Sequence, residues 1–221
     1  MPKVANGIHL DADIARARAE NLEFEATGSR LFHRSGTVRF LTYLNHANMG
    51  NYREAIDEDL AGPRTSPPDI TRTRRQGRHK YGFGLNFEQA IAPDIGVFAR
   101  LGSSAGRNES FAYTEDDGTL ELGVFASGSA WRRRRDRAGI ALVANRIVGA
   151  HQQYLALGGL GFLLGDGGLT YAPEKIFEAF YTTHIWRGLF ASFDIQHLDN
   201  PGYNQARGPV TVPGLRFHAD F

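Results

Sequence analysis

Along most of the chain, large apolar residues alternate with glycine or polar residues, which is the two-residue period of a β-strand. In 81–88, every odd position is Tyr, Phe or Leu, and every even position is Gly, Asn or Glu. This alternation predicts an all-β protein of nine or ten strands, each about ten residues long, as a tilted membrane strand requires. Residues 8–16 are compatible with the tenth strand, and 12–19 equally with a short helix. The other alternating segments are 22–27, 38–44, 95–102, 120–127, 138–144, 177–185, 189–196 and 215–221.

The connections between these segments alternate in length. Short turns are expected at 92–94, 131–135 and 186–188. The longer connections, at 46–77, 103–117, 146–173 and 199–209, are rich in Gly, Pro, Asn and charge. Short turns at one rim and long loops at the other are typical of an outer-membrane β-barrel. A soluble sandwich whose loops alternate by chance stays open as the alternative, and without a repeat or linker we expect one domain over 1–221.

Charge and hydropathy narrow the choice of function. Lys plus Arg (25) nearly cancels Asp plus Glu (24), so we expect no nucleic-acid partner, and the arginine run 132–135 is interpreted as a solvated turn. With no cysteine and no metal-ligand spacing among the eight histidines, we expect no metal and no cofactor. No apolar run approaches the roughly 18 residues of a membrane-spanning helix. The mean hydropathy of −0.35 does not exclude membrane strands, because alternating faces average out.

Glycine is the unusual component of the composition. The chain has 26 glycines in 221 residues, about 12%, against a typical ~7%. Several of them, such as Gly82 and Gly84, lie beside large aromatic residues in the alternating segments. This arrangement suits a barrel wall that does not need to fill its interior. The alternative is that these glycines mark bulges or sheet corners.

Six blocks of sequence resemble one family, the carbohydrate-selective outer-membrane porins of the OprB type. The blocks are 81–89, 106–115, 154–167, 199–204, 207–210 and 214–221, so that 78–221 is the most clearly family-like part. The chain also ends in an amphipathic strand closing on Phe221, which resembles the terminal signal read by the machinery that inserts barrels. The family barrel has about sixteen strands. With nine or ten strands and no apolar leader, this chain is expected to be the carboxy-terminal part of such a porin.

The resemblance implies a channel of the bacterial outer membrane without enzymatic activity. Mono- or oligosaccharides would diffuse passively through a water-filled lumen lined by charged and aromatic groups. The implied partners are these sugars, outer-membrane lipid, the barrel-assembly machinery and further copies in a homo-oligomer. The alternation gives the pore-lining and substrate-contact candidates: Arg39, Lys80, Glu88, Arg100, Glu121, Glu178, Asp194, Gln196, Arg216, His218 and Asp220. Asp194, Gln196, Arg216 and His218 form the best local cluster, on two adjacent strands.

Two other functions stay open at this stage. A soluble β-sandwich binding module would pack the apolar positions of 81–87 into a core. An outer-membrane barrel enzyme would need a Ser–His pair on the outer face. His197 is the outward histidine on a strong strand, and no serine is placed against it by the sequence.

Overall fold

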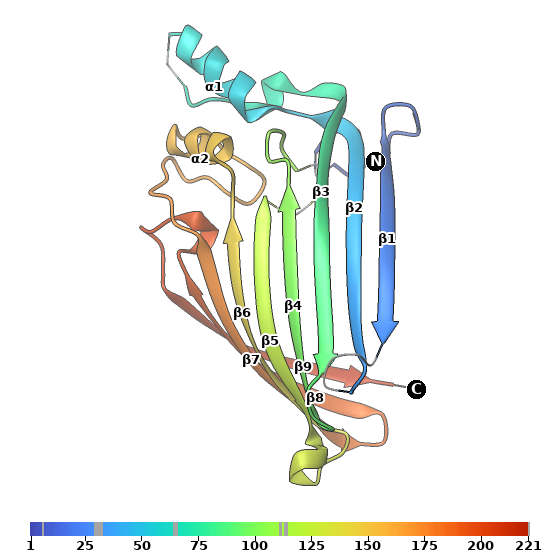
Figure 1. Cartoon of the computed structure of the whole chain (residues 1–221). Helices are drawn as coiled ribbons and strands as arrows, with labels where there is room; N and C mark the ends of the chain where they lie inside the picture. Colours follow the sequence, from blue (N-terminus) through green and yellow to red (C-terminus); the bar gives the residue numbers. More distant parts are fainter. Residues whose placement is uncertain (6, 29–32, 64–65, 111, 113–114, 221) are drawn as a thin grey trace.

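Nine antiparallel strands form a single sheet in which each strand pairs with its neighbours in the sequence (Figure 1). The computed structural model describes the chain except for residues 6, 29–32, 64–65, 111, 113–114 and 221, which places the predicted terminal Phe221 outside the described residues. The all-β prediction of nine or ten strands is confirmed, with nine strands among the described residues. The strands are β1 (Arg18–Gly28), β2 (Gly36–Met49), β3 (Arg75–Ala90), β4 (Ile95–Ser104), β5 (Gly118–Ser127), β6 (Arg137–Arg146), β7 (Glu174–Trp186), β8 (Leu189–Asp199) and β9 (Val210–Ala219).

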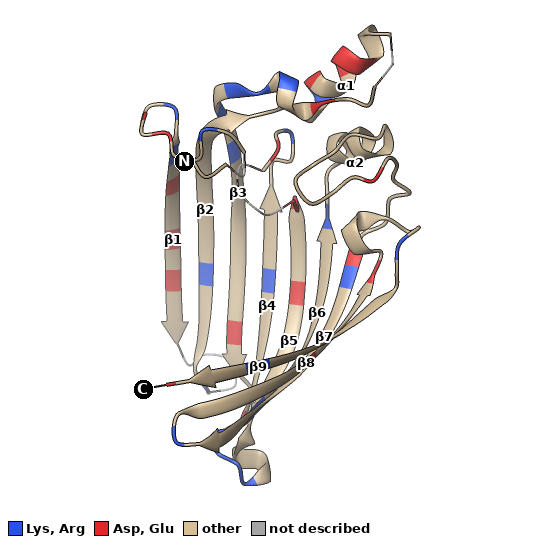
Figure 2. Ribbon diagram, turned by 180° about the vertical axis from the view of Figure 1, so that it is seen from behind, with Lys and Arg blue, Asp and Glu red and all other residues tan. Residues whose placement is uncertain are grey.

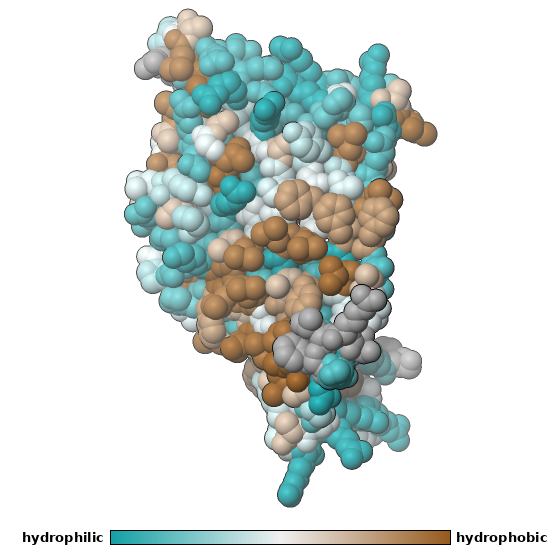
Figure 3. All heavy atoms as spheres, viewed as in Figure 1, coloured by the Kyte–Doolittle hydropathy of each residue, from teal (hydrophilic) through white to brown (hydrophobic). Residues whose placement is uncertain are grey.

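The sheet is strongly curled and is not closed by its described strands. β8 and β9 swing round behind the other strands in Figure 1 and lie in front of them in the reverse view of Figure 2. β1 and β9 each pair on one side only. Figure 3, seen from the side of Figure 1, shows a band of apolar residues across the middle of the convex face. On the apolar face of the sheet, large side chains such as Phe24, Tyr81, Leu142 and Phe217 are exposed.

Residues 8–16 do not form the tenth strand, and 12–19 do not form the short helix allowed by the sequence. Apart from an isolated bridge between Leu10 and Pro2, this segment has no strand pairing. The side chain of Asp11 accepts a hydrogen bond from the Asp13 amide at 3.0 Å, and that of Asp13 accepts one from the Ala15 amide at 3.1 Å. Such local bonds occupy the amides that a helix or a strand would use, so regular structure begins at Arg18.

The short connections are at one end of the sheet and the long connections at the other, as predicted (Figure 1). The long connections are shorter than expected. The first covers 50–74 rather than 46–77, because β2 and β3 are longer than predicted. They also contain helices that the sequence pattern did not predict. These are α1 (Tyr52–Ala61), α2 (Gly149–Ala156) and the 3-10 turns η1 (Ile70–Thr73) and η3 (Pro201–Tyr203), while η2 (Gly128–Trp131) lies at the short-turn end.

The hydrophobic core of the described residues lies among the long connections, and no second sheet covers the apolar face of the described sheet. Buried residues of α1, η1 and α2, including Tyr52, Ile56, Ile70 and Tyr154, pack together into what we call the rim cap. The Tyr154 hydroxyl accepts from the Ile70 amide at 3.1 Å and donates to the Leu160 carbonyl at 2.9 Å. None of the described helices is both long and apolar enough to cross a membrane.

Candidate functional site

The strand register places the predicted site residues on one face of the sheet, opposite the apolar band. In the register of neighbouring strands, Arg39 pairs with Asn86, Asn86 with Arg100, and Arg100 with Glu121. On the later strands, Glu178 pairs with Gln196, and Ser192 with Arg216. This concave polar face carries Arg39, Lys80, Glu88, Arg100, Glu121, Glu178, Asp194, Gln196, Arg216 and His218, with Asp220 directly after β9.

On the first five strands, the charged residues of this face pair across neighbouring strands. Arg39 Nε lies 2.7 Å from a Glu25 carboxylate oxygen, and its Nη1 lies 3.3 Å from Glu88. Arg100 lies 3.1 Å from Glu121. All of these side chains remain partly exposed, so the pairs contribute little to stability. Their effect is to hold guanidinium and carboxylate groups at fixed places on the wall, with free lone pairs and donors facing solvent.

A second group of candidates surrounds a hollow of about 480 Å³ on β7, β8 and β9. Gln196 donates to the Glu178 carboxylate at 3.2 Å, and the Thr182 and Ser192 hydroxyls lie 2.8 Å apart. The predicted cluster is therefore brought together except for His218, which lies nearer the short-turn end. Polar groups convergent on a hollow with one aromatic wall can bind hydroxyl-rich rings weakly. The residues lining it are Glu178, Phe180, Thr182, Ser192, Asp194, Gln196, Gly214, Leu215 and Arg216.

Lys80 differs from the other candidates because it is buried at the edge of the rim cap. Its side chain is 8% exposed, and Nζ lies 3.4 Å from a carboxylate oxygen of Asp117, which is 2% exposed. The other Asp117 oxygen accepts from the Val148 amide at 3.0 Å and lies 3.5 Å from His151 Nδ1. Burial alone would raise the pKa of Asp117, but the His151 bond, the Lys80 charge and the Val148 amide together hold it below its usual value.

Asp117 thus ties the start of β5 to the beginning of α2. It supplies a carboxylate at a helix N-terminus whose own N-cap, Val148, has no side chain to cap it. Beside this pair is a hollow of about 240 Å³ to which Tyr43, Ser110 and Asp116 contribute. Alternation could have indicated Tyr43, which shares the face of Arg39. It could not indicate the other two, because they come from a connection that has no period.

Several aromatic side chains of the polar face pack over glycines of the next strand, which accounts for part of the glycine excess. Phe98 is level with Gly123, and Gly96 with Phe125. A β-carbon added at Gly123 would collide with the Phe98 ring, and one at Gly96 with the Phe125 ring. These glycines lie within regular strands, so here the interpretation as bulges or corners is wrong. The excess provides room for rings to lie across the wall.

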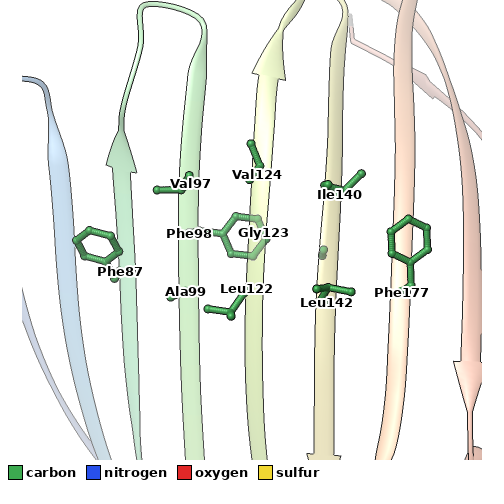
Figure 4. Close-up of a pocket in the computed structure, with 11 residues that line it drawn as sticks. Phe87, Val97, Phe98, Ala99, Leu122, Gly123, Val124, Ile140, Leu142 and Phe177 are labelled. Atoms are coloured by element: carbon green, nitrogen blue, oxygen red, sulfur yellow. The ribbon is translucent and has the colours of Figure 1, made fainter. Parts of the chain in front are cut away.

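Figure 4 shows the opposite, apolar side of the same strands. Around a hollow of about 410 Å³, Val97, Leu122, Val124 and Ile140 project from β4, β5 and β6 (Figure 4). Nearly all of its lining is apolar, and it has no polar group that could orient a ligand. Such a face suits the hydrocarbon of a membrane rather than a ligand site.

Within the described residues, no group of three or more His, Cys, Asp or Glu side chains is placed to hold a metal ion. Long antiparallel strands, apolar on the convex side and charged on the concave side, with short turns and long loops at opposite rims, define a β-barrel porin wall.

The chain belongs to the family described as "Carbohydrate-selective porin, OprB family", whose model matches residues 3–221. A solved structure, "High pH structure of Pseudomonas putida OprB", has the same fold, with a TM-score of 0.75 at 15% identity. The match covers 97% of this chain and 51% of that chain, so this chain spans about half its length. A comparison with curated proteins finds no match. Porins of this family are outer-membrane proteins that act as transport channels rather than enzymes, and the family disfavours the soluble module.

Proposed function

We propose that this chain forms about half of the wall of an outer-membrane channel through which sugars diffuse passively. The observation that carries the proposal is the division of the sheet into two faces. The convex face exposes large apolar side chains, whereas the concave face is lined by charged groups, many of them in ion pairs on its first five strands, by hydroxyls and by aromatic rings. A wall of this kind offers hydrogen bonds to sugar hydroxyls at several places without binding any of them tightly, as conduction requires.

Two hollows of the concave face give the pathway successive contact points. Near the rim cap are Tyr43, Ser110 and Asp116, and further along are Glu178, Asp194 and Gln196. Carboxylate and amide oxygens accept from sugar hydroxyls, and the Phe180 ring offers an apolar surface to the face of a pyranose. The remaining pore-lining candidates on β2 to β5 serve this pathway as the charged side of the wall.

The proposed partners follow from the two faces and the two edges. Outer-membrane lipid would cover the convex face. The unpaired backbone of β1 and β9 needs further strands, because open edges are not tolerated within a bilayer. Recognition by the barrel-assembly machinery through Phe221, and association into homo-oligomers, stay predictions from the sequence.

The test is to purify the chain in detergent, reconstitute it into planar bilayers and record conductance with and without glucose or a longer sugar. Discrete channels whose current is reduced by sugar in a concentration-dependent manner support the proposal. Glu178→Gln combined with Asp194→Asn should alter the sugar block, whereas Leu122→Val, on the convex face, should leave it unchanged. A monodisperse protein that is soluble without detergent and never conducts would overturn the proposal.

A further inference from the structure

Five arginines gather around one hollow at the short-turn end of the polar face. The hollow has a volume of about 770 Å³ and lies between the β5–β6 connection, the β7–β8 turn and β9. Figure 2 shows the basic residues of both turns at this end of the sheet. We call this the arginine hollow; its arginines are Arg134, Arg135, Arg137, Arg187 and Arg216.

The arginine hollow has an uncompensated positive charge. None of its five arginines forms an ion pair with a described carboxylate, and its one acidic lining residue, Asp220, is bound to His218 at 2.6 Å. This differs from the upper part of the same wall, where Arg39 and Arg100 are both paired with glutamates. The partners that the structure gives them are uncharged or aromatic: Arg135 donates to the Arg187 carbonyl at 3.4 Å, and the Arg187 guanidinium lies over the Trp186 ring. A set of guanidinium groups without carboxylate partners on a solvent-facing concavity is suited to binding an anion.

The β5–β6 connection, which carries Arg134 and Arg135, is held in place by a buried carboxylate. Asp136 is almost fully buried and accepts from Arg133 Nε, from the Tyr181 hydroxyl at 2.5 Å and from the His184 amide at 3.0 Å. Arg133 is thereby neutralised. Arg134, which follows it, takes no part in these bonds. These bonds fix the conformation of the turn, and the guanidinium of Arg134 lines the hollow instead of pairing with Asp136.

The other residues that line the hollow indicate which chemical groups the bound anion has besides its negative charge. Phe180 and Phe190 give the hollow two aromatic surfaces, and the Thr182 and Ser192 hydroxyls lie 2.8 Å apart on its floor. Rings and hydroxyls of this kind complement a pyranose, and a guanidinium pairs with a carboxylate or phosphate in a two-pronged geometry. Because Arg137 and Arg216 lie on the polar face, this ligand comes from the channel side and not from a lipid headgroup.

We propose that the arginine hollow binds anionic saccharides, such as sugar acids and sugar phosphates, at the short-turn end of the channel. This inference rests on the proposed function, since it assigns a substrate class to one end of the same wall. It goes beyond that function, because neutral sugars need no uncompensated arginines. Raising the ionic strength should weaken the binding, since the arginines are solvent-accessible.

Tryptophan fluorescence provides the test, because both tryptophans of the chain lie at the short-turn end of the sheet, where the arginine hollow is found. Trp131 ends η2, and the Trp186 ring lies 4.7 Å from the Arg187 guanidinium. The full chain in detergent micelles is titrated with glucuronate, glucose 6-phosphate, glucose and inorganic phosphate. Glucuronate and glucose 6-phosphate should each bind at least tenfold more tightly than glucose, and more tightly than inorganic phosphate.

Two matched variants separate the site from net charge. Arg134→Gln combined with Arg216→Gln should weaken glucuronate binding about tenfold, because two solvent-facing guanidinium contacts are lost. The control, Arg53→Gln combined with Arg72→Gln, removes two positive charges from α1 and η1 at the opposite rim and should leave binding unchanged. If the double variant does not fold, Arg134→Gln alone tests the site from an exposed turn.

Three results would overturn the inference: equal affinity for glucuronate and glucose, equal affinity for inorganic phosphate and glucuronate, or full affinity in the double variant. The titration in micelles needs no conducting channel, so its outcome is distinct from that of the proposed function. Glucose flux without a preference for sugar acids would contradict the arginine hollow as a binding site and leave the channel intact.

Discussion

The replacement Asp117→Asn should destabilise the rim cap by removing its buried charge. Asparagine keeps one oxygen that can accept from the Val148 amide, but Lys80 would remain buried without the carboxylate it pairs with, keeping its hydrogen bond to the Ser110 hydroxyl at 3.2 Å. Leaving one member of a buried ion pair without its partner costs about 3 kcal/mol or more in the free energy of unfolding. Urea denaturation of the detergent-folded chain, followed by circular dichroism, measures this loss.

A double variant distinguishes loss of the pair from general damage to the rim cap. Combining Lys80→Met with Asp117→Asn removes both charges and should recover about 2 kcal/mol of the loss, because no buried charge is left unpaired. The pH dependence gives a second check. Since the pKa of Asp117 is lowered by folding from its usual 3.8, its stabilisation is present above pH 3.8 and is lost as the pH falls below that value. Equal stability of Asp117→Asn and the unmodified chain at pH 7 would refute this account.

Three further predictions concern the turn, the glycines and the aromatic wall. Asp136→Asn should loosen the β5–β6 connection, so that trypsin cleaves at 132–135 faster than in the unmodified chain; an unchanged cleavage rate would show that Asp136 does not hold the turn. Gly123→Val should cost about 1–3 kcal/mol in urea denaturation, because it displaces Phe98, whereas Gly28→Ala, which meets no atom within 4 Å, should cost far less. Phe180→Ala should weaken sugar block of the channel while leaving single-channel conductance in salt similar or slightly higher, and unchanged sugar block would argue against a ring contact.

The strands could be predicted because each has one apolar face and one polar face, so that apolar and polar residues alternate along its sequence. In 81–88 apolar and polar positions alternate without interruption, and in 95–102 only Phe98 departs from the pattern. The alternation tells which residues of β3 and β4 share a face, as their pairing shows. The helices of the long connections leave no such signal. α1 and α2 are short and are held by packing between connections far apart in sequence, such as Tyr52 stacked on His151 at 4.1 Å.

The same contrast applies to the site. Arg39, Arg100 and Glu121 could be placed on one face by counting along their strands, but their partners depend on which strands are neighbours. The arginine hollow illustrates the limit more clearly. Its arginines come from two turns and two strands, and the run 132–135 alone is typical of a solvated turn. Only the curled sheet brings Arg187 and Arg216 beside it.

The central claim is that one face of this sheet lines water and the other meets lipid. Because the chain has no cysteine, single cysteines can be introduced at each position from 119 to 126 on β5 and tested in lipid vesicles with a membrane-impermeant thiol reagent. Positions such as Glu121→Cys, on the polar face, should react, whereas neighbours such as Leu122→Cys should be protected by lipid. Alternating reactivity along β5 supports the account, and uniform reactivity, or protection of the polar face, would contradict it.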